Sequence, residues 1–438
     1  MSDRFEVPIA GGLDVPLPRM ARVRQTFDPT RLDDVAGVVR DEMRRPEIAG
    51  LVEPGQRIAV GCGSRGVANV AETAKTVVEE LRRLGAEPFI FPAMGSHGGA
   101  TALGQTGVLA NYGITEAAMG VPVLATMETV VIGELDDGTP IHVDRHAHEA
   151  HGIVLINRIK PHTTFRADIE SGIVKMIGIG MGKHAGATAL HFHGMDRFDV
   201  LLPKAAEHVL ANTPFLFGVG LVENAYDETV IVEAIPAASL LEREEVLQAE
   251  AKSRMGRIFF HEIDVLVIDR MGKEISGSGF DPNITGRNNR GVEGFDDPLV
   301  NKIVVLDLTD ATHGNATGLG LADVITRRLF DRIDYGATWA NVITSNYLDG
   351  GTIPIVMHTA REAVALGAKT ALRVESGEAR IVRIRDTLTL GTIMVSEPML
   401  EEVRAHSDME AIGPPEPFAF TPDGRLEPIA LEMSHAAD

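Results

Sequence analysis

The chain has 438 residues, more than a single hydrophobic core ordinarily holds, so two domains are expected. Hydrophobic residues make up 44% and charged residues 24%, a balance typical of globular rather than disordered proteins. The formal net charge of -21 argues against nucleic-acid binding, because that function needs a basic surface.

The lone Cys62 rules out an internal disulfide, suits a reducing compartment, and is expected to be a small buried apolar side chain. The first residues lack the basic stretch and apolar run of a signal peptide. No run of about 18 apolar residues is present, so no membrane-spanning helix is predicted. We expect a soluble, cytoplasmic protein with no membrane partner. The oligomeric state stays open, with a homodimer as one option.

The first half of the chain alternates buried strands with helices, as parallel α/β sheets do. Apolar runs predict strands at residues 57–61, 88–92, 152–157 and 215–222. Helical periodicity predicts helices at residues 33–45, 70–84, 201–211 and 240–255. A short hairpin is expected from residues 130–133 and 140–143, joined across Asp136-Asp137-Gly138.

A second α/β pattern begins at residues 264–268 and continues with a strand at 303–308 and a helix at 321–332. The domain boundary is therefore placed near residues 256–263. We predict an N-terminal α/β domain (1–260) and a C-terminal α/β domain (261–438). Both sheets are expected to be mostly parallel, with the active site in the cleft between the domains.

Polar and basic side chains follow five of the predicted strands directly. Open α/β sheets bind ligands beyond the carboxyl ends of their strands, so these residues mark a candidate site. They would form a basic, His-rich crevice suited to a small carboxylate or phosphate. The residues are Ser64-Arg65, Ser96-His97, Lys160-Pro161-His162, Arg270-Met271-Gly272-Lys273 and Asp310-Ala311-Thr312-His313.

The segment 158–193 concentrates histidines and lysines among glycines and apolar residues. Lys175 has apolar neighbours, so its side chain either reaches out to solvent or is a desolvated nucleophile. His191 and His193 would diverge by about 200° on a helix but share one face of a strand. The spacing does not decide which of the two histidines points into a site.

Other features favour ordinary structural explanations. The histidine-rich stretch 142–151 is interpreted as a solvated connection rather than a metal site. The glycines of 178–186 fit neither the Walker A spacing nor the dinucleotide-binding fingerprint. Trp339, the only tryptophan, is expected to lie in a core rather than to cover a ligand.

Several stretches, taken in order, resemble the nickel-pincer-dependent lactate racemase family. Gly63-Ser64-Arg65-Gly66 falls where that family has an Asp-x-Thr-Arg-Pro-like turn, of which only the arginine remains. Gly95-Ser96-His97 resembles the family's Gly-x-His loop. The other matching stretches are GIVLINRIKPH (152–162), SGIVKMIGIG (171–180), DPNITG (281–286) and DATHGNATGLGLAD (310–323).

The resemblance implies a covalent cofactor. Lys175 would be joined to a nickel-pincer nucleotide, a pyridinium bisthiocarboxylic acid mononucleotide, through a thioamide that also gives nickel a sulfur ligand. His193 or His191 would complete the metal sphere, since imidazole and sulfur ligands suit nickel. Further cofactor or substrate contacts are expected from Ser64, Lys183, Lys273 and Gly314.

The resemblance also implies an isomerase acting on a 2-hydroxy acid. His97 and His162 would be the acid and base on opposite faces of the substrate, and Arg65 would hold its carboxylate. The C2 hydrogen would leave as a hydride to the cofactor while a histidine takes the hydroxyl proton. Two alternatives remain: a zinc- or iron-dependent hydrolase or lyase acting on a small carboxylate, and a non-catalytic relative that binds a small acid or the cofactor.

Overall fold

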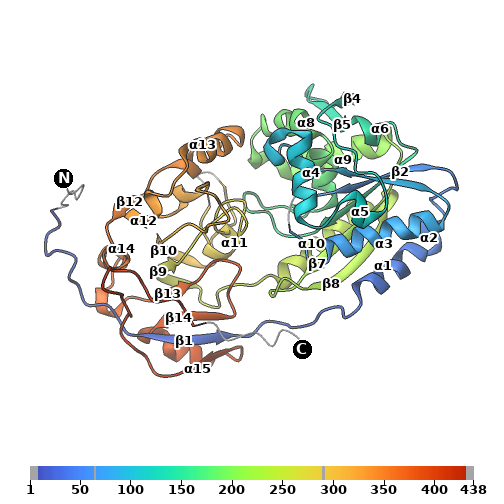
Figure 1. The fold of residues 1–438 in the computed structure, drawn as a ribbon. Helices are drawn as coiled ribbons and strands as arrows, with labels where there is room; N and C mark the ends of the chain where they lie inside the picture. Colours follow the sequence, from blue (N-terminus) through green and yellow to red (C-terminus); the bar gives the residue numbers. More distant parts are fainter. Residues whose placement is uncertain (1–7, 64–65, 289–291, 431–438) are drawn as a thin grey trace. The chain divides into compact units, whose positions relative to one another are not determined.

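The computed structural model describes residues 8–63, 66–288 and 292–430. The chain falls into two units, a first unit of Asp28–Met255 and a second unit of Met1–Phe27 with Gly256–Asp438. The break after Met255 lies next to the boundary expected near residues 256–263. The N-terminal residues were expected in the first domain, but β1 (Met20–Gln25) pairs antiparallel with β14 (Thr392–Ser396) and β15 (Met409–Ala411) of the second unit. Figure 1 shows this blue strand beside the orange-red end of the chain.

The first unit is built on a five-stranded sheet with the order β3-β2-β6-β7-β8. The first four strands are parallel and β8 is antiparallel to β7. The strands are β2 (Arg57–Cys62), β3 (Glu87–Pro92), β6 (Gly152–Arg158), β7 (Phe215–Glu223) and β8 (Thr229–Pro236). A separate hairpin joins β4 (Thr129–Glu134) to β5 (Pro140–Asp144), as expected from the turn between them.

Successive side chains of each strand point to opposite faces of this sheet. Because the strands are apolar throughout, both faces are buried under other elements. Ile58, Val60 and Cys62 pack into one core with helices α1 and α3, while Ala59 and Leu155 belong to the core on the other face. The main helices are α1 (Val35–Arg44), α3 (Val70–Arg83), α4 (Ala102–Asn111), α9 (Phe198–Asn212) and α10 (Leu240–Arg254). The shorter ones are α2 (Pro46–Ala49), α5 (Glu116–Met119) and α6 (Arg145–His148).

The second unit contains an eight-stranded mixed sheet with the order β12-β11-β10-β9-β13-β14-β1-β15. Its parallel strands are β9 (Glu262–Ile268), β10 (Leu299–Val305), β11 (Val324–Thr326), β12 (Ile355–Met357) and β13 (Ile381–Ile384). Its helices are α11 (Pro282–Thr285), α12 (Arg327–Phe330), α13 (Tyr335–Thr344), α14 (Ala360–Thr370) and α15 (Leu400–Ala405). The α/β class with mostly parallel sheets is thus confirmed. The expected site between the domains stays a prediction.

Two expectations about the second unit were wrong. The helix predicted at 321–332 is divided, because Val324 and Ile325 extend the sheet beside β10 and the helix begins only at Arg327. The side chain of Thr326 caps that helix start by accepting from the amide of Leu329. Trp339 is not in a core, since 51% of its surface is exposed on α13.

Cys62 is fully buried, and burial raises the pKa of its thiol to about 12. It is therefore the inert, apolar side chain expected from the sequence. In the described part of the chain, no helix combines the length and apolar character needed to cross a membrane.

Candidate active site

The carboxyl ends of β2, β3 and β6 meet at one edge of the first unit's sheet. These strands are parallel neighbours, with Cys62 opposite Pro92 and Ile156. The loops that begin there carry His97 and His162, so the structure confirms that these strand ends share an edge. Ser64 and Arg65, predicted for the same edge, lie outside the described residues.

The loop that carries His97 is fixed against the segment that follows Lys175. Gly95 has a left-handed backbone (φ 58°), and its amide donates to the carbonyl of Gly180 at 3.0 Å. A Cβ atom on Gly95 would lie 3.3 Å from Ile179. The side-chain amide of Gln105 donates to the carbonyl of Gly95 at 2.8 Å and to that of His97 at 3.3 Å. Loop and segment are therefore held in one arrangement.

Lys183 is completely buried behind this loop. Its ammonium lies 2.9 Å from Oδ2 of Asp144 and donates to Oε1 of Gln105 at 3.1 Å and to the carbonyl of Pro92. Burial lowers the pKa of Lys183, and the adjacent Asp144 opposes that shift. Two hydrogen bonds and one ion pair thus surround this buried ammonium. We therefore assign Lys183 to holding β3, α4 and β5 together rather than to the predicted contact with a phosphate or substrate.

Lys183→Met should destabilise the protein strongly, because it leaves the carboxylate of Asp144 buried without a counter-charge. Removing one partner of a buried pair costs about 3–5 kcal/mol. Urea denaturation of the two proteins measures the difference. Lys204→Met is the matched control: Lys204 is 4.0 Å from the fully exposed Asp136, and its loss should change little. An unchanged stability of Lys183→Met would contradict the anchor role.

His162 is buried, with 8% of its surface exposed. Its backbone amide donates to Oε2 of Glu170 at 2.6 Å, and its Nδ1 accepts from the amide of Thr164 at 3.1 Å. Because Nδ1 is an acceptor, the neutral ring carries its proton on Nε2. The ring centroid lies 4.5 Å from that of Phe165. His162 is thus held in one orientation and one tautomer.

An aromatic row connects His162 to His191. Phe165 contacts Phe198 with centroids 5.7 Å apart, and Phe198 contacts His191 at 5.1 Å. The two phenylalanine rings of this row are apolar neighbours of the segment that carries Lys175, since Phe165, Phe198 and Ile173 belong to one buried core. Two histidines that are 29 positions apart in the sequence are therefore joined by direct packing.

His191 ends α8 (Lys183–His191) and is held from its own helix. Its Nδ1 is 2.6 Å from the carbonyl of Ala187. A carbonyl can only accept, so Nδ1 carries the proton and the neutral ring has its lone pair on Nε2. Burial lowers the pKa of His191 most, the bond to Ala187 opposes this, and the charge of Lys175 lowers it further.

His193 has different surroundings. Its Nε2 is 2.7 Å from Oγ1 of Thr139, and its Nδ1 is 3.9 Å from Oδ2 of Asp137. Both partners belong to the turn of the β4–β5 hairpin. Of the two histidines that the sequence left open, His191 is the one whose pKa the charge of Lys175 lowers.

The histidine-rich stretch 142–151 is only partly the solvated connection that was expected. Asp144 is fully buried with Lys183, and Nδ1 of His142 is 2.9 Å from Oγ1 of Thr129. A Cβ on Gly186 would lie 3.3 Å from the Cβ of His142, so α8 packs closely on β5. In the described residues, no three His, Cys, Asp or Glu side chains come together as a metal site.

Lys175 ends the short helix α7 (Ile173–Lys175) and is followed by the π-helix η2 (Met176–Gly180). Single π turns occur often at functional sites. Ile173 and Val174 are fully buried, whereas Lys175 is half-buried. The amides of Ile173 and Val174 both donate to Oε2 of Glu244, at 2.8 and 3.0 Å. Glu244 therefore fixes the start of the helix that carries Lys175.

The role of Glu244 was not predicted from the sequence, although the spacing of polar residues on its helix pointed to it. Glu244, Gln248 and Lys252 follow one another at intervals of four on the helix 240–254, beside the buried Leu247 and Ala251. Polar residues at helical spacing on an otherwise apolar face are costly to bury without partners. That pattern could have marked them as partners of another segment.

Burial raises the pKa of Glu244 to about 8, opposed by the amides of Val174 and Ile173. The folded protein therefore keeps this proton at a pH where the unfolded chain, with an ordinary pKa of 4.5, has released it. The resulting stabilisation is complete below the unfolded pKa and is lost as the pH rises through the folded pKa.

Glu244→Gln removes this titration while keeping one acceptor oxygen. The melting temperature of the unmodified protein, minus that of Glu244→Gln, should fall between about pH 5 and about pH 9. Thermal unfolding monitored by circular dichroism at several pH values measures this difference. A difference that stays constant over the range would contradict the shifted pKa.

The predicted site residues of the second unit lie in the loops after β9 and β10. Nζ of Lys273 donates to the carbonyl of Gly277 at 2.7 Å, and its amide donates to Oγ1 of Thr312 at 3.1 Å. Gly314 has a φ of 79°, and a Cβ there would lie 2.8 Å from the carbonyl oxygen of Arg332. This geometry explains why position 314 needs a glycine. Contacts of Lys273 and Gly314 with a cofactor stay predictions.

Residues 19–198 match the family described as the lactate racemase N-terminal domain. This confirms the family resemblance expected from the motifs. The matched residues include His97, His162, Lys175 and His191 and end at Phe198, the first residue of α9. The supporting helix α10 follows after it.

The chain is also similar to the solved structure of the lactate racemase apoprotein from Thermoanaerobacterium thermosaccharolyticum. The two share 14% sequence identity with a TM-score of 0.47, over 81% of this chain and 97% of that one. No curated protein sequence matches the chain.

Proposed function

We propose that this protein is a racemase or epimerase that inverts C2 of a 2-hydroxy acid, with a nickel-pincer nucleotide joined to Lys175. The observation that carries the proposal is that residues 19–198, which match the lactate racemase N-terminal domain, hold a buried histidine, His191, on whose pKa the charge of Lys175 acts. A lysine-linked metal cofactor would find a ligand in a histidine near its lysine.

The residues present fit such a cofactor. The donor set contains a suitable histidine, His191, whose proton on Nδ1 leaves a lone pair on Nε2. A bond from the other ring nitrogen to a carbonyl is the usual support of a metal-bound histidine. The described residues offer no three-ligand protein site, so a metal here would take its other ligands from the bound group. When bound, that group would accept the C2 hydrogen as a hydride.

The protein's own part in the reaction is to move protons and hold the substrate. His162, which presents Nε2, would exchange a proton with the substrate hydroxyl from one side, and His97 would do so from the other. Burial of His162 excludes water from that transfer. Arg65 is proposed to hold the carboxylate, and Ser64, Lys273 and Gly314 to contact the cofactor.

The covalent attachment is tested by intact-mass measurement of protein co-expressed with pincer-synthesis enzymes. We expect an adduct of nucleotide size that disappears in Lys175→Ala together with racemisation. His97→Ala and His162→Ala should keep the adduct but lose at least about 100-fold in kcat, a typical contribution of acid–base catalysis. Full activity of Lys175→Ala, or zinc without nickel in the purified protein, would refute the proposal.

The choice of metal ligand is tested by the nickel content of adduct-bearing variants. His191→Ala should retain the adduct and lose nickel, because it removes the proposed imidazole ligand. His193→Ala is the matched control and should keep nickel, since the contacts that it loses are to Thr139, Asp137 and Phe192. The reverse pattern, measured by metal analysis after desalting, would show that His193 is the ligand.

A further inference from the structure

One face of α10 carries polar side chains toward the segment 162–175. Glu244, Gln248 and Lys252 are spaced by four, so they line one side of the helix. Glu244 and Gln248 are fully buried, and the side chain of Lys252 is 37% exposed. We call these three residues the α10 brace. Since burying polar groups is costly, their contacts decide what the brace does.

The first contact of the brace holds the helix that carries Lys175. Glu244 accepts the amides of Ile173 and Val174, which come directly before that lysine. Gly172 makes this approach possible, because a Cβ there would lie 2.2 Å from Oε1 of Glu244. The carboxyl group and the glycine therefore fit one another.

The second contact holds the loop that carries His162. Nζ of Lys252 lies 2.8 Å from Oε1 of the fully buried Glu170 and donates to the carbonyl of Ala167 at 2.7 Å. The other oxygen of Glu170 accepts the amide of His162 at 2.6 Å. Between the two contacts, Oε1 of Gln248 lies 3.4 Å from the amides of Glu170 and Ser171.

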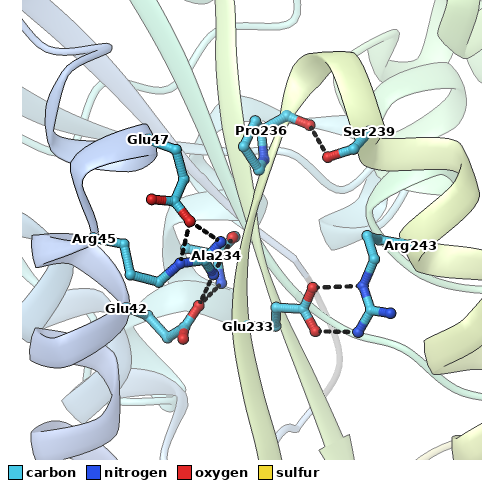
Figure 2. Close-up of polar contacts among 8 residues, drawn as sticks. All are labelled: Glu42, Arg45, Glu47, Glu233, Ala234, Pro236, Ser239 and Arg243. Carbon is cyan, nitrogen blue, oxygen red and sulfur yellow. Dashed lines mark hydrogen bonds and ion pairs between the residues drawn. The ribbon is translucent and has the colours of Figure 1, made fainter.

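The helix that provides the brace is itself fixed to the sheet. Arg243 donates two bonds of 2.7 Å to the carboxylate of Glu233 on β8, as Figure 2 shows. On the other side of β8, Oε2 of Glu42 accepts a hydrogen bond from the amide of Ala234 at 2.9 Å. Arg45 donates to the carbonyl of the same Ala234 at 3.2 Å. The brace is thus anchored one residue away from Glu244.

We propose that the α10 brace is a positioning device that sets the placement of Lys175 relative to His162. The inference rests on the proposed function. None of its residues is assigned to substrate or cofactor, so they act through the two residues that they hold. Placement matters because a misplacement of about 1 Å in a catalytic group can cost 100-fold in rate.

A purely structural role would give a different result, because it would change stability and leave the chemical step intact. The effect of a positioning residue falls on kcat, with KM unchanged, when an interaction made only in the transition state is lost. The brace can therefore be tested by separating kcat from KM in variants that remain folded and carry the adduct.

The test compares Glu244→Ala and Lys252→Met with Glu244→Gln and Glu245→Gln in cofactor-loaded protein. Glu245 is exposed on the same helix and is the matched control. We expect Glu244→Ala to lower kcat by about 10- to 100-fold with KM for the 2-hydroxy acid within about threefold. Glu244→Gln should restore most of the loss, because it keeps an acceptor for the two amides. Lys252→Met should show a smaller loss, since Glu170 keeps its bond to His162.

Hydrogen exchange supplies a readout independent of cofactor and activity. Glu244→Ala should speed exchange of the Ile173 and Val174 amides, and Glu245→Gln should not. Gly172→Ala should copy Glu244→Ala, because its Cβ displaces the carboxyl group. If the unmodified protein carries no adduct, the proposed function fails, and exchange alone then decides whether the brace holds this segment. Unchanged kcat and unchanged exchange in folded Glu244→Ala or, if that variant does not fold, in Lys252→Met and Gly172→Ala would overturn the proposal.

Discussion

The site depends on how the buried backbone between His162 and Lys175 satisfies its hydrogen bonds. Buried amides need acceptors, and this segment is neither a strand of the five-stranded sheet nor a long helix. Buried side chains provide the acceptors instead. Glu170 accepts the amide of His162, and Glu244 accepts two amides before Lys175. The same bonds that complete the backbone therefore also locate the reactive side chains.

These bonds explain why an irregular segment can hold a defined geometry. Asn157, at the end of β6, donates to the carbonyl of Gly172 at 2.8 Å, so the sheet edge and α10 hold the segment from two sides. On the other side of the site, Lys183 links β3, α4 and β5 through two hydrogen bonds and one ion pair. Two buried polar clusters thus hold the loops of His97 and His162, and each contains a carboxyl group that the acidic composition alone would not distinguish.

Much of the first unit could be predicted from the sequence, because its parallel strands are continuous apolar runs. The strands at 57–61, 88–92 and 152–157 were found within about two residues, and with them the shared edge of His97 and His162. The pairing of β1 with β14 could not be predicted, since it joins residues about 370 positions apart and no local pattern records it. Nor could spacing distinguish the surroundings of His191 and His193, because partners such as Ala187 and Phe198 for one and Thr139 and Asp137 for the other are set by folding.

The central claim is that this site interconverts the two configurations of a 2-hydroxy acid. The most direct measurement is chiral chromatography of a panel of single-enantiomer 2-hydroxy acids after incubation with nickel-loaded, adduct-bearing protein. We predict that at least one acid reaches the same mixture of enantiomers, or of C2 epimers, from either starting form. A protein that carries both the adduct and nickel, yet leaves every acid of the panel in its starting configuration, would contradict this account.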